Sequence, residues 1–129
     1  MTTIVFLLFL GAFVAPIIYE RWHFMTNLQA FFTTPLRTRT GLQIHHGHWG
    51  LLFIIISGLW MVFLGRNTPV IIFFGYGLGL LVDEIIPSLK MPSKGRELEL
   101  QIYKSSLRHT LLLAVAFLIC FAILFAMSG

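Results

Sequence analysis

Histidines and carboxylates gather at two places in the sequence and have the chemistry of metal ligands. Residues 45–48 read His-His-Gly-His, and His45 and His48 are three apart, so on a helix they share one face. Asp83 and Glu84 follow an otherwise uncharged apolar run. Imidazole and carboxylate groups without thiolate favour zinc, iron or manganese over copper(I). The pattern predicts a site for a divalent transition metal.

Two further segments are expected to join this site. Glu20 and His23 have the same helical spacing, and His109 stands at the start of the last apolar run. Metal sites in helical bundles are built from carboxylates and Glu-x-x-His pairs on facing helices. The candidate ligands and supporting partners are His45, His46, His48, Asp83, Glu84, His109, Glu20 and His23. So crowded a cluster argues against haem, whose two axial histidines must face each other across the ring.

Composition places these residues in a membrane protein. The chain has 129 residues, of which 57% are hydrophobic and 11% charged, and its mean hydropathy is +0.88. Soluble domains carry about 25% charged residues. The net charge of +4 is attributed to loops facing anionic lipid, with no nucleic acid as a partner. A single cysteine excludes an internal disulfide and a cysteine-based zinc cluster.

The apolar runs predict an all-α fold, an integral membrane four-helix bundle in one transmembrane domain covering residues 1–129. The four expected spans are residues 3–21, 44–64, 69–86 and 105–127. A tight turn of residues 65–69 separates the second span from the third, and Pro87 is expected to end the third. Between the first two spans, residues 22–34 alternate polar and apolar residues at helical spacing. They predict an amphipathic helix lying in the membrane interface.

The basic residues predict the orientation in the membrane. Of nine Lys and Arg residues, eight fall on one side of a four-span arrangement and only Arg66 on the other. The eight are Arg21, Arg37, Arg39, Lys90, Lys94, Arg96, Lys104 and Arg108. The positive-inside rule then predicts a multi-pass protein of the cytoplasmic membrane, with both termini outside and both long loops in the cytoplasm. All histidines and acids fall at the cytoplasmic ends of the spans.

Glycine spacing in the third expected span predicts the direction in which the side chains of Asp83 and Glu84 point. Gly75 and Gly79 form a small-x-x-x-small pair that lets a neighbouring helix approach closely, and Asp83 continues that face. Glu84 lies seven residues after Gly77, so it also follows a glycine. Both acids are therefore expected to face protein. A buried carboxylate should meet a cation or a histidine there.

Two motifs carry a resemblance to a known group of proteins. His45-His46-Gly47-His48-Trp49-Gly50 opens one span, and Gly75-Tyr76-Gly77-Leu78-Gly79 with Asp83-Glu84 closes the next. This pairing resembles small polytopic membrane proteins of prokaryotes that are uncharacterised. The match covers about residues 44–86 and implies the motif pairing, but it implies no activity.

Three functions fit the sequence. The first is a metal-binding membrane protein, an enzyme acting on a lipid-like substrate if the metal keeps an open coordination position. The second is an accessory structural subunit of a larger membrane complex, or a homo-oligomer, in which the polar cluster is a metal-free network. The third is an ion or proton carrier. The scarcity of polar residues in the outer half argues against a carrier.

Overall fold

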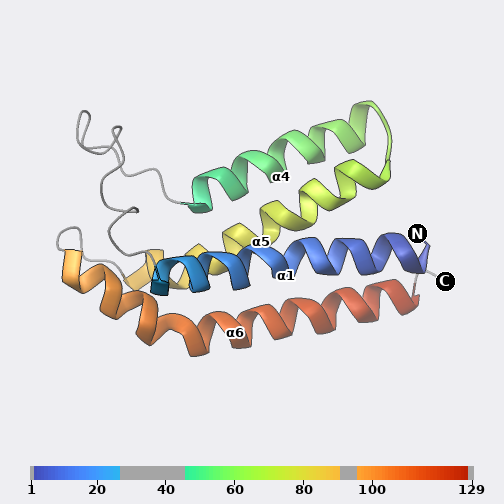
Figure 1. The fold of residues 1–129 in the computed structure, drawn as a ribbon. Coiled ribbons are helices and arrows are strands. Elements are labelled where there is room, and N and C mark those ends of the chain that lie inside the picture. The colour runs from blue at the N-terminus through green and yellow to red at the C-terminus, as the bar shows by residue number, and fades with distance from the viewer. Residues whose placement is uncertain (1, 27–45, 91–95, 128–129) are drawn as a thin grey trace, which may run out of the picture.

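The described part of the chain is entirely helical, which confirms the predicted all-α class. The computed structural model describes residues 2–26, 46–90 and 96–127. They form four helices, drawn in Figure 1: α1 (Thr3–Thr26), α4 (His46–Phe63), α5 (Thr68–Lys90) and α6 (Arg96–Met127). The N- and C-termini lie at the same end of the molecule (Figure 1).

Three of these helices are long and apolar enough to cross a membrane. The candidate spans are Thr3–Trp22, Thr68–Leu89 and Lys104–Met127. They match the first, third and fourth expected spans, and they indicate a membrane protein. The second expected span, residues 44–64, corresponds to α4, whose apolar stretch Gly47–Phe63 is shorter than the other three.

Helix boundaries differ from the predictions at two places. α1 continues without a break to Thr26, so residues 22–26 belong to the first helix and do not begin an interfacial helix. The remainder of that predicted helix, residues 27–34, lies outside the described residues. α5 continues through Pro87 to Lys90, so the expectation that this proline ends the third span is wrong.

α5 is the central helix of the fold. It packs against α1, α4 and α6, and α1 and α6 also touch. Among the described helices, α4 packs on α5 and on no other. Figure 1 shows α1 and α5 running in one direction and α4 and α6 in the other, with the α4–α5 hairpin inclined to the α1–α6 pair. The arrangement is layered around α5, with α4 on its outer side.

Glycines on two faces of α5 allow both close neighbours to approach. A Cβ added at Gly75 would come within 2.8 Å of Phe9 of α1, and one added at Gly79 would overlap the backbone of Phe13. On another face, a Cβ at Gly77 would lie 2.8 Å from the backbone oxygen of Gly50 in α4. The prediction that Gly75 and Gly79 admit a neighbouring helix is thus confirmed.

The apolar core joins the three helices that contain candidate spans. Phe13 and Ile17 of α1, Val82 of α5 and Ala114 of α6 are buried together. Phenylalanines extend this contact along α1 and α6: the rings of Phe6 and Phe125 stack at 4.2 Å, and Phe9 meets Phe121 edge-on at 4.9 Å. Aromatic pairs of this geometry add to the free energy of area burial.

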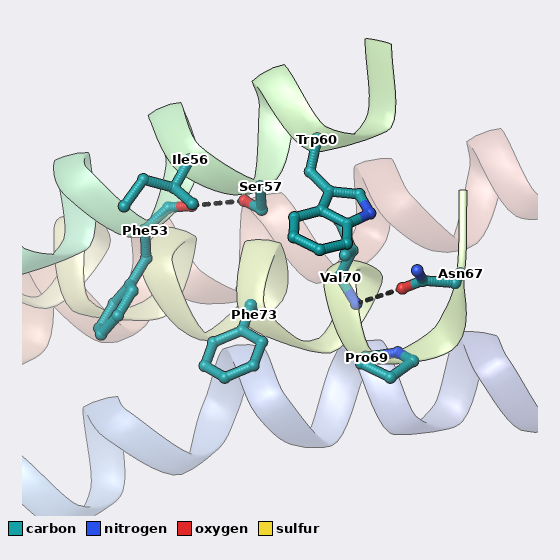
Figure 2. A pocket seen from close by; sticks show the side chains of 8 residues that line it. All are labelled: Phe53, Ile56, Ser57, Trp60, Asn67, Pro69, Val70 and Phe73. Carbon is teal, nitrogen blue, oxygen red and sulfur yellow. Dashed lines mark hydrogen bonds between the residues drawn. The ribbon is translucent and has the colours of Figure 1, made fainter. Parts of the chain in front are cut away.

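The predicted turn between α4 and α5 is present. Gly65 has a φ of 89°, a left-handed conformation that glycine adopts without the cost borne by other residues. Asn67 caps α5, because its side-chain oxygen accepts a hydrogen bond from the backbone nitrogen of Val70 at 3.0 Å (Figure 2).

Candidate functional site

A buried ion pair joins α1 to α5 near the end of the molecule opposite the termini. Arg21 Nε lies 2.5 Å from Asp83 Oδ1, and the two side chains are only 9% and 2% exposed. Arg21 is one of the eight basic residues from which the orientation is predicted, but its side chain lies inside the helix packing and not in the loop. Ile17, one helical turn earlier, belongs to the core, so Arg21 continues the buried face of α1.

Two hydroxyl groups of α6 complete the surroundings of the guanidinium. Arg21 Nη1 donates to Ser106 Oγ at 3.2 Å, and Nη2 donates to Thr110 Oγ1 at 2.8 Å. Both hydroxyl residues are fully buried. Together with Ala114 they stand four residues apart, so they form one face of α6. The planar fork of arginine donors therefore holds three helices at one point.

The proline inside α5 explains the fourth contact of Arg21. Pro87 has no backbone N–H, so the helix cannot supply the usual donor to the carbonyl four residues earlier, which belongs to Asp83. Arg21 Nη2 donates to that carbonyl at 3.1 Å. The arginine thus replaces the missing helical hydrogen bond, and this replacement lets α5 continue past a proline in an apolar setting.

The second acid of the pair faces a different helix. Glu84 is 3% exposed, and a Cβ added at Gly47 of α4 would lie 2.9 Å from its Cγ. Ser88 Oγ, one turn further along α5, donates to Glu84 Oε1 at 3.4 Å. The prediction that both acids face protein is confirmed, and Gly47 belongs to the histidine motif with which Glu84 was paired from sequence.

Glu20 adds a third carboxyl group to this region. It is buried beside Arg21 on α1, and the charges of Asp83 and Glu84 act on it. Among the described side chains, three carboxyl groups and one cation, Arg21, are buried. The buried acids of this region therefore come from both α1 and α5.

Comparisons with known proteins assign this geometry to no family. No protein-family model matches the chain, and no curated protein or solved structure matches it. A functional interpretation therefore depends on the residues of the chain itself.

Only two of the predicted histidine ligands, His48 and His109, have side chains that the structure describes. His48 and His109 are exposed, and His109 lies outside the buried face of α6 because its neighbour Thr110 occupies that face. That His109 joins the cluster therefore stays a prediction. The side chains of His23 and His46, and the whole of His45, lie outside the described residues. Residues 2–26, 46–90 and 96–127 contain no group of three or more His, Cys, Asp or Glu side chains arranged to hold a metal ion.

Sequence reasoning missed three members of the network, namely Arg21, Ser106 and Thr110. For the two hydroxyl residues a signal was available, because Ser106, Thr110 and Ala114 repeat a small residue every fourth position. For Arg21 the signal was its spacing of four from Ile17, on the side of α1 that also carries Phe13.

A pocket between α4 and α5 lies in the other half of the molecule. It has a volume of about 440 Å³ and is lined mainly by apolar side chains, with Trp60 and Phe73 on either side (Figure 2). Its hydroxyl group is already used, since Ser57 Oγ donates to the backbone oxygen of Phe53 at 2.5 Å. Asn67 also lines the pocket, and its side-chain oxygen already caps α5. This pocket suits apolar groups and offers little to orient a polar substrate.

Proposed function

We propose that the chain is a small integral membrane protein that crosses the membrane four times. In this proposal it serves as an accessory structural subunit of a larger membrane complex, with a metal-free buried polar network. The observation that carries it is the Arg21–Asp83 ion pair, completed by Ser106 and Thr110. Asp83 is one of the carboxylates predicted to bind a metal, and its side chain pairs with an arginine.

The network has the character of a structural contact. A guanidinium that bonds to side chains of two other helices fixes the rotation and depth of those helices in the membrane. No hydrophobic force drives helices together within lipid, so interhelical hydrogen bonds of this kind help to hold them in place. Arginine is always protonated, and its fork matches a carboxylate. Such a group locks an arrangement, whereas a proton carrier needs a group that releases its proton.

The fourth crossing in this proposal is α4. Its 18 residues extend about 27 Å at 1.5 Å per residue, slightly less than a hydrocarbon core of about 30 Å. Flanking residues and local thinning of the bilayer accommodate a mismatch of this size. With four crossings both termini lie on one side, in agreement with their positions in Figure 1, and the charges of the loops favour the outside.

The outer position of α4 supports the subunit role. Among the described helices α4 contacts α5 alone, and large apolar side chains such as Ile55 and Leu59 are about half exposed around its other sides. A helix that is hydrophobic all round is buried in lipid or in protein. A partner subunit packed beside α4 would bury these side chains.

A second candidate function is metal binding at the α4–α5 end. Gly47 packs against Glu84, so the histidine motif at the start of α4 comes next to a buried carboxylate. Glu84, His45, His46 and His48 are the ligands of this alternative, with Glu20 and His23 on the neighbouring helix. A site of this kind with an open position would support a membrane enzyme.

Purification from the native membrane at its natural expression level tests the subunit role. We expect the protein to migrate with a larger assembly in a mild detergent, and subunits recovered with it identify that assembly. A lone species of 14.7 kDa under these conditions would contradict the proposal.

Metal analysis of the same preparation separates the two candidates. We expect a folded protein with less than stoichiometric zinc, iron or manganese. A stoichiometric metal that disappears in a His45→Ala/His48→Ala variant, but stays in a His109→Ala variant, would favour metal binding instead. The His109 variant is the matched control because that side chain is exposed on α6.

A further inference from the structure

A groove with one cation lies near the end of the molecule that carries the termini. It has a volume of about 650 Å³, within the range of about 300–1,000 Å³ for small-molecule sites. All four helices contribute to its lining, which includes Phe9, Gly58, Met61, Phe74 and Phe121. The groove lies where α4, which packs on α5 alone, leaves space beside α1 and α6.

Arg66 gives this groove its charge. It lines the groove from the α4–α5 connection and is itself exposed. In the described part of the chain it forms no ion pair, and all five acids of the sequence belong to the opposite ends of the helices. A ligand that satisfies both the apolar walls and this cation has an apolar chain and an anionic head.

We propose that this groove is a binding site for an anionic phospholipid. One acyl chain lies between α4 and the α1–α6 pair, against the phenylalanine side chains, and the phosphate of the head group meets Arg66. The bilayer supplies this ligand directly, and the orientation predicted from the loop charges puts its head group in the outer leaflet. The inference does not depend on the subunit role or on metal binding.

Gly58 allows the groove to be filled without damage to the fold. A Cβ at this position meets no heavy atom within 4 Å, so a larger side chain would enter the groove. Gly11 of α1 is equally open, is exposed and is absent from the lining, so it provides a matched control. For the head group, Arg66→Gln removes the charge, and Lys104→Gln removes an exposed charge at the other end of the molecule.

Native mass spectrometry with defined lipids tests the proposal. The full chain in detergent is titrated with phosphatidylglycerol and with phosphatidylcholine of the same acyl chains. We expect wild-type protein to bind the anionic lipid about fivefold more tightly, the effect of one basic residue near a membrane surface. Arg66→Gln should remove this preference, whereas Gly58→Leu should weaken binding of both lipids. Gly11→Leu and Lys104→Gln should behave as wild type.

A photoreactive group in the acyl chain checks the position of the lipid. Crosslinks are expected at Met61 or Phe74, which line the groove, and not at Leu112, which is exposed on the outer side of α6. Equal affinity for both head groups in the wild type would overturn the proposal. So would crosslinks confined to Leu112 and other residues outside the lining, or a second copy of the chain, captured by crosslinking at Met61, in place of lipid.

Discussion

Asp83 and Glu84 are consecutive residues of α5, and their buried side chains lie against different helices. Asp83 pairs with Arg21 of α1, whereas Glu84 lies against Gly47 of α4. Successive residues of a helix point about 100° apart, so a pair of neighbouring acids can serve two interfaces. One dipeptide thus connects the central helix to both of its close neighbours.

Removing one partner of the ion pair should destabilise the fold strongly. We expect Asp83→Asn and Arg21→Gln each to lower the free energy of unfolding by about 3–5 kcal/mol, because each leaves a buried charge without its counterion or partner. The double variant should lose less than the sum of the two single variants. Unfolding of the purified protein by SDS in mixed micelles, followed by circular dichroism, measures all three. Additive losses would mean that the two side chains do not interact.

The hydroxyl of Thr110 should contribute a measurable share of this network. Thr110→Val keeps the shape of the side chain and removes the acceptor for Arg21 Nη2. We therefore expect a loss of about 1.5–3 kcal/mol, the range for hydrogen bonds to charged groups. Its control is Ser105→Ala, since Ser105 is exposed and bonds only to its own helix. That variant should stay within about 0.5 kcal/mol of wild type. Equal effects of the two changes would argue against the contact.

The close approach of α1 and α5 should depend on Gly79. A methyl group there would overlap the backbone of Phe13, so the two helices must move apart in Gly79→Ala. We expect a loss of about 1–3 kcal/mol, as for other overpacked cores. Gly11→Ala, where the added methyl meets open space, should be neutral or stabilising by about 0.5–1 kcal/mol. Thermal melting in detergent compares the two.

Two glycines of α4 should differ in their tolerance of alanine. A Cβ at Gly50 would lie 2.7 Å from the backbone oxygen of Gly77, whereas one at Gly47 would lie 2.9 Å from Cγ and 3.1 Å from Cβ of Glu84 and would meet no backbone atom among its nearest contacts. Backbone atoms of a helix cannot turn aside, so Gly50→Ala should lower the melting temperature clearly more than Gly47→Ala. The reverse order would show that the start of α4 is the tighter contact.

The features that sequence predicts well are those with a local period. Apolar runs reveal the helices, and the four-residue spacing of Gly75, Gly79 and Asp83 reveals one face of α5 before any neighbour is known. The same kind of spacing predicts that the side chains of Asp83 and Glu84 point toward neighbouring helices. These predictions succeed because helical geometry alone decides which residues share a side.

The features that sequence misses depend on pairings between distant segments. Arg21 and Asp83 are 62 residues apart. The positive-inside rule counts all arginines near the ends of spans equally, so it does not distinguish the buried Arg21 from an arginine in a loop. Pro87 is a helix breaker by local rules, and it is tolerated because Arg21 bonds to the carbonyl that the proline leaves open. The exposure of His109 depends on how α6 is rotated, which the helix contacts decide.

The contacts of α5 also have a consequence for the order in which the protein is made. α1 and α4 emerge first during synthesis, and among the described residues they do not contact each other. α5, whose glycines contact both helices, is synthesised third. α6, which carries the hydroxyl groups of Ser106 and Thr110, is synthesised last. In the proposed four-crossing topology, α1 and α4 therefore have no contact with each other before α5 is synthesised, and the ion pair of Arg21 with Asp83 forms only once α5 is present.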